Sequence, residues 1–171
     1  MRMKQLVAEI AAGLIGGYVG TKVMEPVEMK LYAMESAEAR QQEDRVRPGP
    51  PYDIAAHRTT EVLGLHLDEQ QLKTVGTIFF HYGLGMGWGA LTAVFQRRTK
   101  LTPLFAGAIS GTVMWVVVDE GMTPAFGFSA PDSAYPLVTH LRAFVGHLVF
   151  GVTAALAASI LLWLGRQDAR P

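Results

Sequence analysis

Residues 74–96 run without a single aspartate, glutamate, lysine or arginine, and this stretch limits what the chain can fold into. A helix needs about 20 mostly apolar residues to cross a bilayer core roughly 30 Å thick. Residues 101–120 and 136–165 are similarly apolar, and residues 5–24 carry charges only near their ends, where long side chains reach water. Runs of this length without polar alternation are helices rather than barrel strands. The sequence therefore predicts an all-α fold, an integral membrane four-helix bundle in one membrane domain over residues 1–171.

Composition agrees with a membrane protein and excludes several classes of function. Half of the residues are hydrophobic and 18% are charged, whereas roughly 25% is usual for soluble domains. The formal net charge is zero, so the chain lacks the basic surplus of a nucleic-acid binder. The absence of cysteine excludes disulfides, thiolate metal sites and cysteine nucleophiles. The lipid bilayer is the partner that the composition predicts.

A polar segment, residues 25–73, separates the first two spans and is expected outside the membrane. Residues 47–51, Arg-Pro-Gly-Pro-Pro, form a stiff break within it. Asp53 is expected to cap a short helix over residues 54–63, and Asp68 to cap a helix that leads into the second span. The segment is therefore predicted to be a short helical cap rather than a second domain.

Four spans place both termini and the loop after residue 96 on the same side. That side is rich in bases and has one acid, Asp168; the bases are Arg2, Lys4, Arg97, Arg98, Lys100, Arg166 and Arg170. Basic residues in short flanks stay in the cytoplasm. The sequence thus predicts that both termini are cytoplasmic.

Topology also gathers the ionisable residues of the spans into one layer. The first and third spans end on the outer side, where the second and fourth begin. The outer half of the bundle should therefore hold Glu25, Glu28, His81, Asp119, Glu120, His140, Arg142 and His147. Such groups cost about 2.5–3.5 kcal/mol at mid-membrane, so they usually have partners or a function. We call these eight residues the polar layer.

Helical phase predicts which members of the polar layer face inward. Glu120 shares a face with apolar Val113 and Val116, which points it toward lipid, and Arg142 is expected to pair with Asp119, Glu120 or Glu28. The inward-facing members are expected to form one polar centre and are the candidate metal ligands: His81, Asp119, His140 and His147.

Glycines line the predicted spans at helix-contact spacing, at positions 13, 16, 17 and 20, 83, 85, 87 and 89, and 107 and 111. Small residues at this spacing let helices approach closely in a membrane. Packing within one chain and a homo-oligomer or larger complex both fit the pattern. A faint repeat accompanies it: helices ending at Glu25 and Asp119 are each followed by a helix with histidine four residues before glycine, at His81 and His147. This predicts two parallel helix pairs.

Residues 107–151 carry a recognisable pattern. It comprises Asp-Glu-Gly-Met-Thr-Pro at 119–124, Tyr-Pro at 135–136, His140, and Gly-His-Leu-Val-Phe-Gly at 146–151. This pattern resembles the YagU-like inner-membrane protein family. The resemblance implies a multi-span bacterial inner-membrane protein and supplies neither an activity nor catalytic residues.

Three functions stay open on the sequence. A structural or accessory membrane protein needs only that the polar layer is internally paired. An oligomeric protein that handles protons or solutes would use the histidines, which titrate near neutral pH. A metal-binding protein or enzyme would use the four candidate ligands, but the sequence has no His-Glu-x-x-His motif, phosphate-binding loop or dinucleotide fingerprint. The sequence requires no cofactor and favours a non-enzymatic protein.

Overall fold

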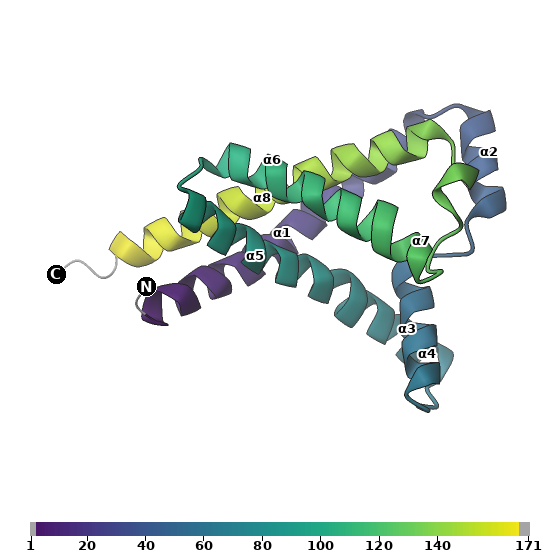
Figure 1. Ribbon diagram of the computed structural model, residues 1–171, viewed down its shortest axis with the longest axis horizontal. Helices are drawn as coiled ribbons and strands as arrows, with labels where there is room; N and C mark the ends of the chain where they lie inside the picture. The colour runs from purple at the N-terminus through teal and green to yellow at the C-terminus, as the bar shows by residue number, and fades with distance from the viewer. Residues whose placement is uncertain (1–2, 168–171) are drawn as a thin grey trace.

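The computed structural model describes residues 3–167, and over these residues it is helical with no strand (Figure 1). Four continuous helical stretches are long and apolar enough to cross a membrane: Met3–Met34, Glu69–Thr99, Pro103–Ala125 and Leu137–Gln167. Their outer faces carry large exposed apolar side chains, among them Phe79, Leu91 and Ile160, as expected of surfaces that lipid covers. The predicted all-α bundle and its multi-pass character are confirmed.

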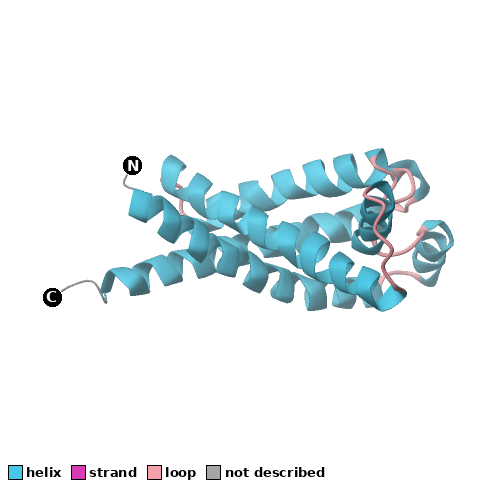
Figure 2. Cartoon of the chain, turned by 90° about the horizontal axis from the view of Figure 1, so that it is seen from below, coloured by secondary structure: helices cyan, strands magenta, loops and turns pink. Residues whose placement is uncertain are grey.

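The elements follow in the order α1 (Met3–Met34), α2 (Ala37–Val46), α3 (Pro51–Val62), α4 (Glu69–Val75), η1 (Gly76–Tyr82), α5 (Gly83–Thr99), α6 (Pro103–Met114), η2 (Trp115–Met122), α7 (Thr123–Ala125), η3 (Asp132–Ala134) and α8 (Leu137–Gln167). The described ends of the long helices near the two termini lie at one end of the bundle, and α2, α3 and the long loops lie at the other (Figures 1 and 2). We call these the terminal end and the loop end.

The first helix extends beyond the predicted span. Helix α1 continues through Pro26 to Met34, so Glu25 and Glu28 lie inside it instead of following it. Proline removes one backbone hydrogen bond, but good helix formers such as Met29 and Lys30 follow it and extend the helix. The helix therefore does not end at residue 24, where the first span was predicted to end.

The predicted helix caps are partly confirmed. Thr102 caps α6 and Asp68 forms a capping box with Gln71 at α4. Helix α3 begins at Pro51, because proline suits the first helical position, and Asp53 lies in its first turn instead of capping it. Helix α2, capped by Ser36, was not predicted.

Two stretches of the spans, η1 and η2, are π-helical. The backbone N–H of Gly83 reaches the carbonyl of Ile78, and that of Thr123 reaches the carbonyl of Val118, five residues back in each case. A wider turn changes the direction in which the following side chains point. Faces assigned from a regular α-helical period are therefore displaced along these stretches.

Glycines bring the helices into backbone contact within the chain. A Cβ atom on Gly13 would lie 2.5 Å from the Cα atom of Ala90, and one on Gly107 would lie 2.5 Å from the Cα atom of Val152. Gly16 packs in the same way against Ala154 of α8. These contacts support the packing of helices inside one chain. Gly87, by contrast, has open space around it.

The two helix pairs share a glycine register. Gly13 meets Gly89 and Gly17 meets Gly85 between α1 and α5, while Gly107 meets Gly151 and Gly111 meets His147 between α6 and α8. In this register His147 occupies the place of Gly85. The sequence repeat that equated His81 with His147 is therefore off by one turn. In addition, α1 packs closely on α8, whereas α5 and α6 have little contact, so the pairs are not related by a symmetric two-fold.

Candidate functional site

A cavity of about 310 Å³ opens at the loop end of the bundle, between α1, α2, η1, η2 and α8. Every member of the polar layer except Glu25 lines it. Glu25 lines a neighbouring cavity of about 500 Å³, which shares Glu28, His81 and Arg142 with the first. The prediction that the polar layer collects at one end of the bundle thus agrees with the geometry. The residues of the layer line cavities and do not form a solidly packed core.

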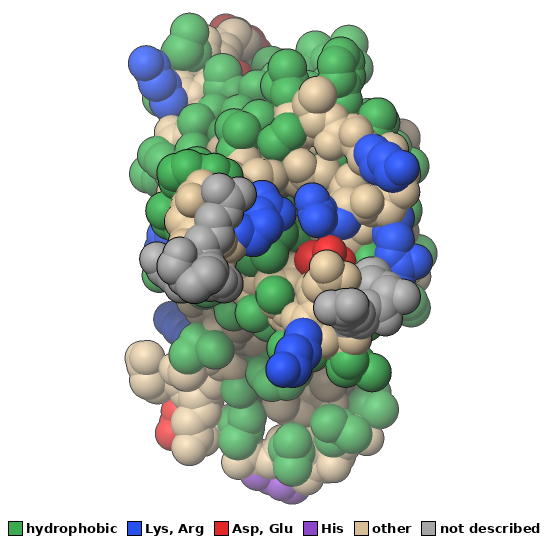
Figure 3. Space-filling view, turned by 90° about the vertical axis from the view of Figure 1, so that its left-hand side faces the viewer, with side chains coloured by type: hydrophobic (Ala, Val, Ile, Leu, Met, Phe, Trp, Pro, Cys, Tyr) green, Lys and Arg blue, Asp and Glu red, His purple; other side chains and the backbone are tan. Residues whose placement is uncertain are grey.

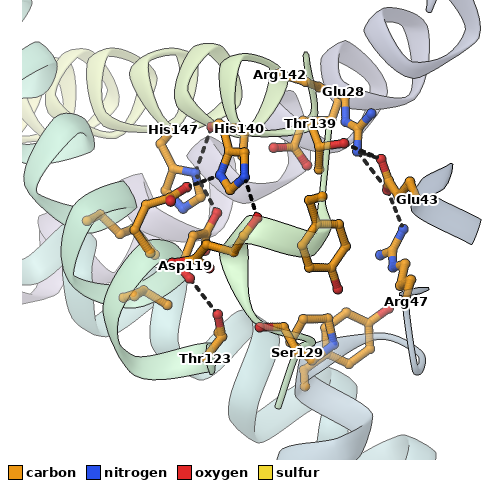
Figure 4. Close-up of a pocket in the computed structure, with 18 of the residues that line it drawn as sticks. Glu28, Glu43, Arg47, Asp119, Thr123, Ser129, Thr139, His140, Arg142 and His147 are labelled. Atoms are coloured by element: carbon orange, nitrogen blue, oxygen red, sulfur yellow. Dashed lines mark hydrogen bonds and ion pairs between the residues drawn. The ribbon is translucent and has the colours of Figure 1, made fainter. Parts of the chain in front are cut away.

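His140 connects α8 to η2 and to the loop before α8 (Figure 4). Its Nδ1 atom lies 2.7 Å from Oε1 of Glu120, and its Nε2 atom lies 3.2 Å from the backbone carbonyl oxygen of Asp132. A carbonyl oxygen only accepts, so Nε2 carries a proton. The contact with Glu120 then holds a second proton, which resides either on Nδ1 or on the carboxyl group.

Glu120 was predicted to face lipid, and this prediction was wrong. Its side chain is 26% exposed and points at His140. The wider turns of η2 rotate residues 119 and 120 relative to the regular α-helical phase. Asp119 and Glu120 consequently both line the cavity.

His147 and Asp119 form a second pair across the same two elements. The Nδ1 atom of His147 donates to the carbonyl oxygen of Ala143 at 2.9 Å and lies 3.5 Å from Oδ2 of Asp119. Because Nδ1 carries the proton in the neutral ring, Nε2 then presents a lone pair. His147 is 4% exposed. Gly151, Ala154 and Ala158, which lie on the same face of α8, are also buried, so the inward face predicted for this helix is correct.

His81 pairs with Glu25 and, within the described residues, has no hydrogen bond or ion pair with His147 or Asp119. Its Nε2 atom is 3.1 Å from Oε1 of Glu25, which also accepts a hydrogen bond from the Tyr82 hydroxyl at 2.9 Å. Lys22 contacts the other carboxylate oxygen at 3.3 Å. The predicted single centre of His81, His147 and Asp119 is therefore divided into two acid–histidine pairs, Glu25–His81 and Asp119–His147.

Arg142 has partners other than those predicted. Its Nη2 atom donates to both carboxylate oxygens of Glu43, at 2.8 and 2.7 Å, and its Nη1 atom contacts Glu35. The side chains of Arg142, Glu35 and Glu43 are 11%, 3% and 2% exposed. The expected pairing with Asp119, Glu120 or Glu28 was wrong, because α1 continues to Met34, directly before Glu35, and α2 places Glu43 over α8.

Two further residues complete this buried network. Arg47 donates to Oε1 of Glu43 at 3.3 Å, and the Thr139 hydroxyl donates to Oε2 at 2.8 Å (Figure 4). Sequence reasoning missed Glu35, Glu43 and Arg47. The signal that could have located Glu43 was Ser36, a favourable N-cap ahead of the helix that carries it.

Glu28 differs from the other acids of the cavity. It lies over Gly146 and lines both cavities. Within residues 3–167, its carboxyl group has no hydrogen bond and no ion pair with another side chain, and Asp119 has only the 3.5 Å contact with His147. Two carboxyl groups thus face the cavity without a close donor from the protein.

The lining does not gather the candidate metal ligands at one point. Over the described residues, no group of three or more histidine or acidic side chains is arranged to hold a metal ion, so the four candidate ligands do not converge on one site. On the loop, burial and the neighbouring Glu120 raise the pKa of Asp132.

Comparison with known proteins finds no matching family model, no matching curated protein and no matching solved structure.

Proposed function

We propose that this chain is a multi-pass protein of the bacterial inner membrane that binds a small organic cation in the cavity at its loop end. The observation that carries the proposal is the pair of carboxyl groups, on Glu28 and Asp119, that face the cavity without a close donor. Both acids are partly buried, and acids that lose contact with water without gaining a partner are costly. A cationic solute would supply the missing donor and charge.

The charge balance of the lining supports a cationic ligand. Arg47 and Arg142 are matched by Glu35 and Glu43 in the buried network. The remaining acids of the lining are Glu28, Asp119, Glu120 and Asp132, and they face three histidines, of which His81 is already paired with Glu25. With these four acids ionised, the cavity would keep an excess of negative charge even if His140 and His147 were protonated.

Size and shape support the same ligand class. A volume of about 310 Å³ is at the lower end of small-molecule sites, which span roughly 300–1,000 Å³. Aromatic rings of Tyr52, Phe80 and Tyr135 line the wall, and aromatic faces attract organic cations. Both π-helical stretches contribute lining residues, and such distortions are frequent at functional sites.

We expect replacement of Glu28 with glutamine to weaken binding of an organic cation at least about tenfold, because glutamine cannot supply the negative charge that pairs with a bound cation. Isothermal titration of the detergent-solubilised protein with choline and with putrescine measures the effect. Glu69→Gln, at a side chain that is 79% exposed on α4, is the matched control and should bind as the unaltered protein does.

An uncharged analogue separates charge from shape in this experiment. 3,3-Dimethylbutan-1-ol has the shape of choline without its charge and should bind weakly to the unaltered protein. Binding of the alcohol as tight as that of choline, equal affinity of Glu28→Gln and unaltered protein, or no binding of either cation would each contradict the proposal.

The orientation of the protein in the membrane is a further expectation. Lys4, Arg97, Arg98, Lys100 and Arg166 gather at the terminal end, and basic side chains are spread over that face in Figure 3; Arg2, Asp168 and Arg170 lie outside the described residues. Basic flanks favour the cytoplasm, so the cavity would open to the outside. Reporter fusions at Lys100 and Pro50 should give cytoplasmic and external signals respectively, and a cytoplasmic signal from both would contradict this topology.

A structural or accessory role is the second candidate, and a specific observation favours it. The pairs Glu25–His81 and Glu120–His140 each connect two different helical elements, as does the Arg142 network. Such pairs hold helices in register whether or not a ligand binds. Under this reading the cation titrations show no binding while loss of Arg142 still destabilises the protein. Homo-oligomers through the open face at Gly87 remain a prediction.

A further inference from the structure

A second concave surface lies at the terminal end, far from the polar layer. It is a groove of about 350 Å³ between α1, α5 and α8. Its walls are apolar and come from α1 and α8, with Ala8, Ala12, Ile15, Leu161 and Leu162 among them. The ends of α1 and α8 diverge at this end of the bundle (Figure 2). The groove therefore has room and a surface suited to a hydrocarbon chain.

The outer end of the groove is polar and contains an unsatisfied acid. Glu9 is only 6% exposed, and its Oε1 atom accepts a hydrogen bond from Nε of Arg97 at 3.4 Å. Its Oε2 atom is buried and has no hydrogen-bond partner in the described part of the chain. Buried carboxylate oxygens are rarely left without a donor. A ligand that lies in the groove is the natural source of one.

Two arginines flank this carboxylate. Arg97 uses Nε on Glu9, which leaves its terminal nitrogens as donors, and Arg166 of α8 lines the same groove. Guanidinium groups favour phosphate, which they bind through paired hydrogen bonds. The polar end thus offers an acceptor for an ammonium group beside donors for a phosphate group.

The groove also lies at the depth of lipid headgroups. Glu9 and Glu28 are separated by about 28 Å along α1 at the helical rise of 1.5 Å per residue. This separation is close to the roughly 30 Å thickness of a bilayer core. With the polar layer at one boundary of the membrane, Glu9 and Arg97 lie at the other, where a phospholipid changes from headgroup to acyl chain.

From these observations we propose that the groove binds one phospholipid whose headgroup carries a primary ammonium group. The ammonium donates to Oε2 of Glu9, the phosphate contacts Arg97 and Arg166, and an acyl chain lies against Ile15, Leu161 and Leu162. A choline headgroup has no N–H and cannot donate to Glu9. A glycerol headgroup has no positive charge to place beside the carboxylate.

Native mass spectrometry with equal amounts of phosphatidylethanolamine and phosphatidylcholine of the same acyl chains tests the headgroup. The detergent-solubilised protein should retain the ethanolamine lipid about tenfold more than the choline lipid, and Glu9→Gln should bring the ratio close to one. Equal retention by the unaltered protein would overturn the proposal. So would stronger retention of phosphatidylglycerol in a second competition, since it indicates a site for anionic lipids.

A groove-filling variant tests the place of binding without disturbing Glu9. Ala8 is exposed and lines the groove, whereas its neighbour Val7 is exposed and does not line it. Ala8→Phe should therefore reduce retention of the ethanolamine lipid about tenfold, and Val7→Phe should leave it unchanged. Undiminished retention by Ala8→Phe would place the lipid elsewhere and refute the proposal, even where Glu9→Gln fails to fold.

Discussion

Replacing Arg142 with alanine is expected to lower the free energy of unfolding by about 3–5 kcal/mol, the usual cost of removing one partner from a buried ion pair. Two carboxylates, those of Glu35 and Glu43, would lose their common cation while both remain almost completely buried. Thermal unfolding in mild detergent measures the loss. It should appear as a large fall in melting temperature.

Two further variants test whether the loss of stability depends on the buried position of Arg142 or follows from the loss of any positive charge. Arg98 is exposed at the end of α5, so Arg98→Ala should have an effect within about 0.5 kcal/mol. Arg142→Lys keeps the charge but not the two-pronged contact with Glu43, and should fall between the others. If Arg142→Ala and Arg98→Ala unfold at the same temperature, the network does not stabilise the fold.

The fold could be predicted from the sequence because the bilayer imposes a simple rule. An uncharged run of sufficient length must pair its backbone internally and therefore forms a helix. The same rule says little about where a helix ends. Pro26 and its neighbouring acids look like an end, yet the backbone continues to Met34, since one proline costs only one hydrogen bond and the residues after it favour the helix.

Most of the polar layer could be assigned to the site from the sequence, but the contacts within the site could not. Antiparallel spans of similar length must bring the outer ends together, and this places His140 and Asp119 at one depth whatever their neighbours are. The direction of each side chain depends on local geometry. The π-helical stretch η2 turned Glu120 from the lipid face to His140, and a one-turn shift in register separated His81 from His147.

The partners of Arg142 show a second reason why contacts could not be predicted from the sequence. Glu43 reaches α8 only because α2 folds back over the loop end of the bundle. Its position depends on a tertiary contact between segments far apart in the sequence, which periodicity within one helix does not report. Glu28 was predicted as a partner of Arg142 but has no hydrogen bond or ion pair within the described residues, and this difference is the basis of its proposed role in binding.

Replacing Gly89 with alanine should destabilise the bundle by at least about 1–3 kcal/mol, the usual cost of overpacking. The added Cβ atom would lie 2.5 Å from the Cα atom of Gly17. This obstacle is backbone, which cannot move aside as a flexible side chain can. Helices α1 and α5 would have to separate along their glycine contact, and the melting temperature in detergent should fall accordingly.

Gly87, on the same helix, is the matched control for this experiment. Nothing lies within 4 Å of a Cβ atom placed there, so Gly87→Ala should keep or raise stability by up to about 1 kcal/mol, because alanine favours the helix over glycine. Opposite shifts for the two variants would establish that close approach, and not helix propensity, requires glycine at position 89. A fall at Gly87 as large as at Gly89 would instead indicate that the open face packs against a second copy of the chain, since contacts within one chain give no reason for it.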